Sequence, residues 1–189
     1  MTRWKKALLV AALGFALFVS LTAPALGGEA AVGEGGGGYL PLGDVWETSD
    51  TITITSNDIS DWVLLPDQDN TRQGILTVTA DVAWSVTVSD EDTTMTNGKM
   101  TEYDTSTGQY IQSNPAKLGS VMEVKATGEY GTDTYVVLPD GDEIALGSAT
   151  GESGVEVPFL LKQYVSDTDP VSHVGRGYKI VITFTGSVD

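Results

Sequence analysis

The sequence predicts an all-β protein, an antiparallel β-sandwich of the immunoglobulin-like, Greek-key type with about eight to ten strands. From about Thr51 onward, Thr, Val, Ile and aromatic residues recur with a period of two, which is the period of a half-buried strand. Gly, Pro, Asn-Gly and Asp-Gly interrupt these runs at short intervals, as turns do. No segment after the N-terminal apolar run shows the 3.6-residue period of an amphipathic helix.

The clearest strand signal lies between Ile75 and Asp90, where apolar side chains occupy successive even positions. This unbroken parity predicts one long strand that bends across both sheets, because a straight strand usually has about 3–10 residues. A tight turn at Asp81 is the alternative. Trp84 shares the inward parity and is predicted to lie in the core, as is Trp62, for which an exposed sugar-binding platform is the alternative. The even-numbered apolar residues are Leu76, Val78, Ala80, Val82, Trp84, Val86 and Val88.

Four further segments follow the same rule. Residues 120–126 alternate as a strand, and residues 134–146 are predicted to form a hairpin whose turn is the sequence Pro-Asp-Gly. Residues 154–165 also alternate, but Pro158 has no N–H to donate, so this strand is predicted to lie at an edge or to contain a bulge. Residues 177–186 are predicted to be the last strand, with Tyr178, Ile180, Ile182 and Phe184 facing the core.

Residues 1–27 have the pattern of a secretory signal peptide. Arg3, Lys5 and Lys6 precede the apolar run 7–21, and small residues follow it, so cleavage after Ala25 or Gly27 fits. An uncleaved N-terminal membrane anchor is the alternative, because the apolar run is nearly long enough to span a bilayer. After removal of this segment, no later part of the sequence is apolar enough to be a transmembrane segment.

Residues 28–48 are predicted to be a Gly-rich linker followed by an apolar N-terminal segment, ahead of a single β-sandwich domain over residues 49–189. The apolar segment could cover its own sandwich as a flap, or it could be donated as a strand to another subunit. Pro41 and Gly43 interrupt its alternation, which favours the flap for an isolated chain. The candidate assembly residues are Tyr39, Leu40, Leu42, Val45 and Trp46.

The chain is strongly acidic, with a formal net charge of −16. Removing the three basic residues of the predicted signal peptide leaves seven Lys and Arg against 26 Asp and Glu, a net charge of −19. Nucleic acid and anionic membranes are disfavoured as partners, because both would repel such a chain. The absence of cysteine excludes disulfides, thiol catalysis and zinc–thiolate sites, so the core alone must stabilise the fold.

The sequence contains few residues suited to catalysis, so a non-enzymatic protein is predicted. The single histidine, His173, is flanked by a Gly-containing loop sequence and is predicted to be a surface residue. No nucleophile elbow, phosphate-binding loop, dinucleotide fingerprint or metalloprotease helix is present. Paired carboxylates for glycoside hydrolysis could arise by chance among 26 acidic residues, so a hydrolase is the least favoured function.

No cofactor motif is present, and calcium is the one metal that the sequence raises. Asp140, Asp142 and Glu143 follow one another at a predicted turn, and hard cations prefer several oxygen ligands that converge from a loop. These three residues are the weak calcium candidates. Solvated turn residues are the alternative, because none of the acidic clusters completes the EF-hand pattern.

Two short motifs resemble those of the WxL-type cell-surface domains. The sequence Trp84-Ser85-Val86 stands where that family has Trp-x-Leu, and Tyr178, Ile182, Thr183 and Phe184 stand for its C-terminal Tyr-x-x-x-Leu-Thr-Trp motif. Val86 and Phe184 depart from the family pattern, and the match covers about twenty residues. The resemblance implies an exported β-rich module that attaches non-covalently to an envelope polymer.

These observations predict a secreted, non-enzymatic cell-surface or filament protein, structural or adhesive in role, that could assemble through its N-terminal segment. Its expected partners are further copies of itself or an envelope polymer. A stand-alone carbohydrate- or cell-wall-binding module is the alternative. The position of residues 39–48 distinguishes the two predicted roles of this segment. Packed on the chain's own sandwich, the segment is a flap; donated to another subunit, it is an assembly strand.

Overall fold

Antiparallel strands make up all the regular structure of the described residues. The structure, a computed structural model, describes residues 9–11, 51–56, 59 and 62–188. The strands are β1 (Leu9–Ala11), β2 (Ile52–Ser56), β3 (Trp62–Leu64), β4 (Gln68–Ala80), β5 (Trp84–Asp90), β6 (Thr101–Asp104), β7 (Glu123–Ala126), β8 (Val136–Val137), β9 (Asp142–Gly147), β10 (Val155–Val165), β11 (Arg176–Lys179) and β12 (Ile182–Val188).

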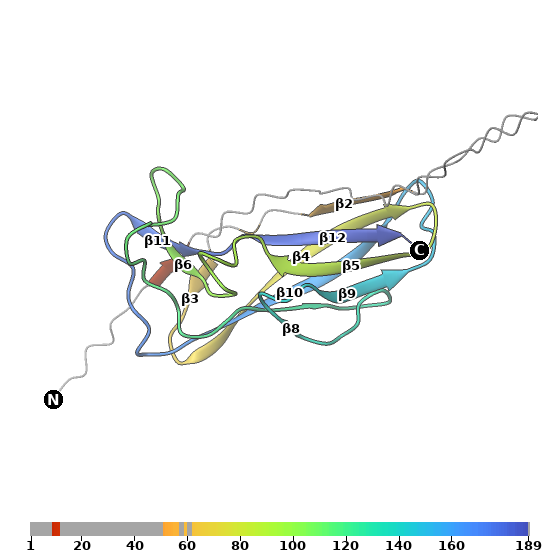
Figure 1. The fold of residues 1–189 in the computed structure, drawn as a ribbon. Helices are drawn as coiled ribbons and strands as arrows, with labels where there is room; N and C mark the ends of the chain where they lie inside the picture. The colour runs from red at the N-terminus through yellow and green to blue at the C-terminus, as the bar shows by residue number, and fades with distance from the viewer. Residues whose placement is uncertain (1–8, 12–50, 57–58, 60–61, 189) are drawn as a thin grey trace, which may run out of the picture.

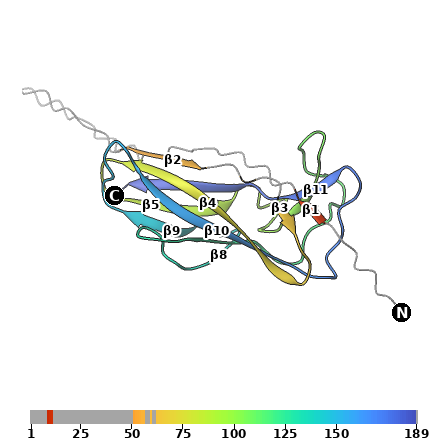
Figure 2. The ribbon, with the colours of Figure 1, turned by 180° about the vertical axis from the view of Figure 1, so that it is seen from behind.

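Two sheets form the body of the molecule. One has five strands in the order β2-β4-β10-β7-β8, and the other has three in the order β12-β5-β9. The pairs β11–β6 and β1–β3 lie together at one end of the molecule, as both ribbon views show (Figure 1, Figure 2). Every strand pairing is antiparallel, so the prediction of an all-β antiparallel sandwich is confirmed.

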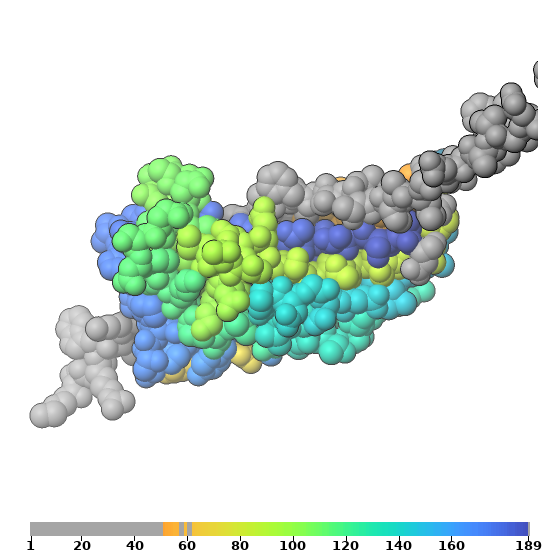
Figure 3. Space-filling model, viewed as in Figure 1, coloured from red at the N-terminus to blue at the C-terminus, as the bar shows by residue number. Residues whose placement is uncertain are grey.

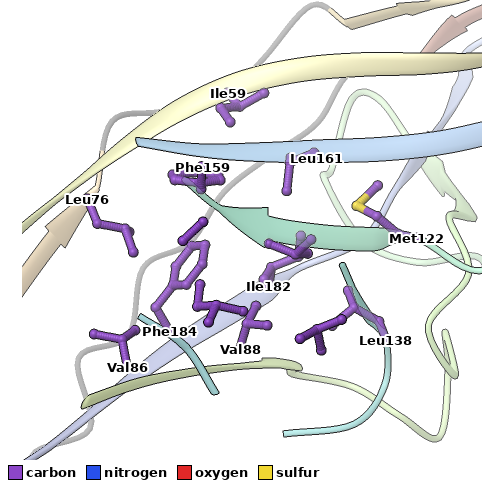
Figure 4. Packing of buried hydrophobic residues seen from close by; sticks show 14 of the residues in the cluster. Ile59, Leu76, Val86, Val88, Met122, Leu138, Phe159, Leu161, Ile182 and Phe184 are labelled. Carbon is purple, nitrogen blue, oxygen red and sulfur yellow. The ribbon is translucent and has the colours of Figure 1, made fainter. Parts of the chain in front are cut away.

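The core fills the space between these two sheets (Figure 4). Phe159 of β10 meets Phe184 of β12 with ring centroids 5.1 Å apart and the rings tilted, the arrangement that aromatic pairs prefer. Trp62 and Trp84 are both buried, as predicted, and the Trp84 indole N–H donates to the carbonyl of Ser148 at 2.7 Å. The period-two alternation of the sequence therefore does mark the side chains that face the core.

The predicted long strand at residues 76–88 is wrong in one respect. The chain does pass from one sheet to the other, but β4 ends at Ala80 and β5 begins at Trp84. Local hydrogen bonds replace the ladder at the break: the Thr51 backbone N–H donates to Asp81 Oδ1 at 2.7 Å, and the Ala80 N–H donates to the Thr150 hydroxyl at 3.0 Å. The two strands do not pair with each other, so the break is a crossing between sheets.

The predicted hairpin over residues 134–146 is also wrong. β8 pairs with β7 in the larger sheet, whereas β9 pairs with β5 in the smaller one. The turn around Pro139 therefore carries the chain across the sandwich. Residues 130–132 cover the free edge of β9 instead: the Leu146 N–H donates to the Tyr130 carbonyl at 3.0 Å, and the Thr132 N–H donates to the Ile144 carbonyl at 2.8 Å.

Strand β10, predicted to lie at an edge or to contain a bulge because of Pro158, is central, between β4 and β7, and its register with β4 has no shift. β7 pairs only with Phe159–Lys162, so Pro158 lies just beyond the end of β7. Its carbonyl accepts from the Thr127 N–H on that side at 2.8 Å. Since the N–H and C=O of a strand residue point the same way, the missing N–H also faces the side where strand pairing has stopped.

The predicted last strand is divided in the same way as residues 76–88. All four of its inward-facing residues, Tyr178, Ile180, Ile182 and Phe184, are buried as predicted. However, β11 pairs with β6, whereas β12 pairs with β5. The carbonyl of Val181, between the two strands, accepts from the Glu91 N–H at 3.0 Å. Parity is therefore a sound guide to burial here, while strand boundaries depend on tertiary pairing.

Candidate functional site

The edge of β3 is the first candidate site. β3 pairs antiparallel with β1, in the register Leu9↔Leu64, Val10↔Val63 and Ala11↔Trp62. Among the described residues this is the only strand pairing that β3 makes. β1 also lies beside β11 (Figure 2). Its three residues belong to the apolar run that the sequence predicts to be the centre of a signal peptide.

The side chains of β3 alternate sharply between the core and solvent. Trp62 and Leu64 are buried, whereas Val63 is 47% exposed and the following Leu65 is 50% exposed. The inward side chains fix β3 to the body of the molecule, and the outward ones leave apolar surface at its edge. Such an edge is a template for another strand when its backbone groups are unpaired.

Asn70 ties the end of β3 to the larger sheet. Its side-chain Oδ1 accepts from the Leu65 N–H at 2.7 Å, and its Nδ2 donates to the Leu65 carbonyl at 3.0 Å. The same Nδ2 lies within hydrogen-bond distance of the carbonyls of Gln68 and Gln163, at 3.1 and 3.2 Å. Asn70 is itself buried, so its side-chain amide is shielded from water. These bonds position β3 independently of β1.

Replacing Asn70 with alanine is expected to lower the free energy of unfolding by about 2 kcal/mol, because it leaves the backbone N–H and carbonyl of Leu65 without their partner. Urea unfolding of the purified protein, followed by tryptophan fluorescence, measures the change. The control is Gln73→Ala, which alters an exposed position on the same strand. Equal midpoints for the two variants would contradict the role assigned to Asn70.

A buried carboxylate, Glu102 on β6, forms the second cluster. Its side chain is 1% exposed. Oε1 lies 2.6 Å from the Nδ1 of His173 and accepts from the His173 backbone N–H at 3.2 Å. Oε2 accepts from Arg176 Nη1 at 3.0 Å and from the Ala116 N–H at 3.5 Å. One carboxylate therefore holds the segment before β11 and the segment between β6 and β7, which includes the green lobe that projects from one end in Figure 3.

The pKa of Glu102 is set by two opposing effects. Burial favours the neutral acid and raises the pKa, but the hydrogen bonds from His173, Arg176 and Ala116 favour the carboxylate. The bonds prevail and lower the pKa from 4.5 to about 2. Glu102 is consequently ionised throughout the neutral and mildly acidic range.

In a catalytic triad, a carboxylate orients a histidine, and the histidine activates a nucleophile beside it. The Glu102–His173 pair resembles the carboxylate and the histidine of such a triad. The described residues give His173 no hydrogen bond to a Ser, Thr or Lys side chain. Its side chain is 68% exposed, in the loop between β10 and β11, so the prediction of a surface-loop histidine is confirmed. The direct effect of the cluster is to fasten this loop. Glu102 has no distinguishing neighbours in the sequence, and sequence reasoning missed it.

The structure does not bring the calcium candidates together into a site. Asp140, Asp142 and Glu143 are all exposed, at the turn before β9 and at the start of that strand. Asp142 and Glu143 are successive strand residues, so their side chains leave on opposite faces. Within the described ranges, no three acidic or histidine side chains are placed to hold a metal ion. Calcium binding stays a prediction of the sequence.

The five candidate assembly residues, Tyr39, Leu40, Leu42, Val45 and Trp46, lie outside the described residues. The residues of the WxL-like motifs are described. Trp84–Val86 lie on β5, Tyr178 lies on β11, and Ile182–Phe184 lie on β12, which pairs with β5. The two motifs thus meet on neighbouring strands around the core.

Comparison with known proteins found no match. No family model matches the chain, and no curated protein or solved structure does so either. The described residues contain no helix with the length and apolar character needed to cross a membrane. The class that the fold defines is an all-β sandwich, and its two distinctive local features are the β3 edge and the Glu102 cluster.

Proposed function

We propose that this chain is an exported, non-enzymatic structural or adhesive subunit of a cell surface or filament, which self-associates by strand addition. The observation that carries the proposal is the pairing of β3 with β1. Because β1 lies within the predicted signal peptide, export would remove the strand partner of β3 and leave its edge open. An open edge with apolar side chains beside it is a site at which another strand can add.

The N-terminal sequence supports the same function. In the processed chain a Gly-rich stretch would form the N-terminal part, and the apolar segment would lie between it and the sandwich, where it could pair with another strand. Copies with a net charge of −19 repel one another, and added salt screens that repulsion over about 8–10 Å at physiological ionic strength. Assembly by strand addition should therefore become stronger as salt increases.

The processed chain, residues 28–189, is expected to form oligomers or filaments whose mean mass rises between about 0.05 and 1 M NaCl, as screening lengths fall from above 10 Å to about 3 Å. Multi-angle light scattering measures the mass, and negative-stain microscopy shows the form. The control is the full chain 1–189, in which β1 is present and mass should stay close to that of a monomer. Monomers of the processed chain at every salt and calcium concentration would contradict the proposal.

Attachment to an envelope polymer, which the WxL resemblance implies, is the less favoured function. Trp62 and Trp84 are buried and cannot serve as a sugar platform. A polysaccharide pull-down that retained the processed chain would nevertheless make the polymer, and not a second copy, the primary partner.

A further inference from the structure

We infer that β3 is the acceptor for the apolar segment Tyr39–Trp46 of a second copy of this chain, in the place that β1 occupies in the structure. The inference rests on the proposed function, because it requires removal of the segment that contains β1. It goes further by naming the acceptor strand, the donor segment and the molecule from which the donor comes.

The acceptor is held in place before any donor arrives. Trp62 and Leu64 are anchored in the core, and Asn70 fixes the Leu65 backbone through two hydrogen bonds at 2.7 and 3.0 Å. The two hydrogen bonds of Asn70 do not involve β1. A preorganised edge loses little conformational freedom on binding, so more of the pairing free energy appears as affinity.

The pairing with β1 shows what kind of strand this edge takes. An antiparallel segment fits beside Trp62–Leu64, with β11 also near it. The sequence of β1, Leu-Val-Ala, is wholly apolar. The processed chain has one apolar segment upstream of the sandwich, and its residues Leu40, Leu42, Val45 and Trp46 supply the same chemistry. Backbone bonds would give affinity, and the alternate side chains would give selectivity.

Chain length favours a second copy over the same molecule as the donor. Ile52, where β2 begins, pairs with Ala80 at one end of β4, whereas the end of β3 is bonded to Asn70 near the other (Figure 1). The ten residue steps from Asn70 to Ala80 span about 33 Å at about 3.3 Å per residue. Trp46 is six residues before Ile52, which gives a reach of at most about 21 Å.

Within one molecule, therefore, only Leu42 and earlier residues can reach the Leu64 end of β3, and only with the chain fully extended. Pro41 lies in that part and cannot donate a backbone hydrogen bond. Val45 and Trp46 fall short. A second copy has no such constraint and can lay any part of Tyr39–Trp46 along β3.

Disulfide trapping tests this arrangement cleanly, because the chain has no cysteine of its own. One processed copy carries Val63→Cys on the acceptor strand, and a second, isotope-labelled copy carries Val45→Cys, with Leu42→Cys as an alternative register. After mixing at high salt and mild oxidation, non-reducing electrophoresis and mass spectrometry quantify the mixed dimer. The matched acceptor control is Val137→Cys on β8, since Val137 is 45% exposed and Val63 is 47% exposed.

The expected result is at least about tenfold more mixed dimer with Val63→Cys than with Val137→Cys, because strand pairing raises the local thiol concentration towards the millimolar range. Val63→Cys in the full chain 1–189 should lose this excess, since β1 occupies the edge. An equal yield from Val63→Cys and Val137→Cys, or an undiminished yield from the full chain, would overturn the inference. If filaments formed while the yields were equal, the proposed function would stand without this acceptor; monomers at every salt concentration would remove both.

Discussion

Truncation of Phe159 to alanine is expected to lower the free energy of unfolding by about 4 kcal/mol. Phe159 is fully buried in the middle of the central strand β10, and its ring packs against Phe184 of the opposite sheet at 5.1 Å. It also covers Gly74, its partner on β4, so tightly that a Cβ at Gly74 would lie 2.2 Å from the ring. The truncation thus removes packing between the two sheets and between two neighbouring strands. Urea unfolding monitored by circular dichroism measures the loss.

Two variants make this prediction specific. Leu160→Ala changes the next residue of β10, which faces away from the core, and should lower the stability by less than about 1 kcal/mol. Gly74→Ala should destabilise the parent protein because of the clash with the ring, but should be much less harmful once Phe159 is alanine. Strictly additive effects of Gly74→Ala and Phe159→Ala would show that the ring does not pack against Gly74.

Replacing Glu102 with glutamine is expected to remove about 3 kcal/mol of stability at neutral pH, which corresponds to the lowering of its pKa from 4.5 to about 2. Between these two pH values the unfolded chain binds a proton at Glu102 while the folded protein does not. Stability from this group is therefore complete above about pH 4.5 and disappears as the pH falls towards 2. The free energy of unfolding of Glu102→Gln should therefore not show this part of the decrease at low pH.

Urea unfolding at a series of pH values between about 7 and 2 measures the effect. The difference in stability between parent and Glu102→Gln should shrink as the pH falls. Arg176→Gln keeps the carboxylate but removes one of its charged donors, so it should raise the pKa of Glu102 and give a smaller acid-dependent loss. Arg72→Gln, at an exposed position on β4, is the control for removing a surface arginine. A constant difference between parent and Glu102→Gln at all pH values would contradict the assignment.

The sequence was sufficient to predict the fold class and much of the core, but not the path of the chain. Burial parity is local, since it depends only on whether successive side chains point up or down. Both sheets of a sandwich face the same core, so the parity of residues 76–88 continues across the break at Asp81 although the strands on either side belong to different sheets. The same reason explains the wrongly predicted hairpin around Pro139.

The candidate sites could be predicted only in part. The position of His173 in a surface loop follows from its Gly-containing surroundings, and the structure confirms it. Its partner Glu102 lies 71 positions earlier and reaches it only because β6 pairs with β11. The pairing of β1 with β3 likewise joins two three-residue segments whose apolar composition carries no information about partners.

The pairing of β4 with β10 also governs how fast the sandwich can form. Val165 pairs with Gln68, 97 positions earlier, along the longest ladder among the described strands. Closing so large a loop loses entropy before any contact compensates for it, and proteins dominated by such distant contacts fold in milliseconds to seconds. A nascent chain can form the β2–β4 pairing early, but the central ladder cannot begin before Val155 has been synthesised and is complete only with Val165. Until then the second edge of β4 has no strand partner, and this interval is when the chain is most exposed to aggregation.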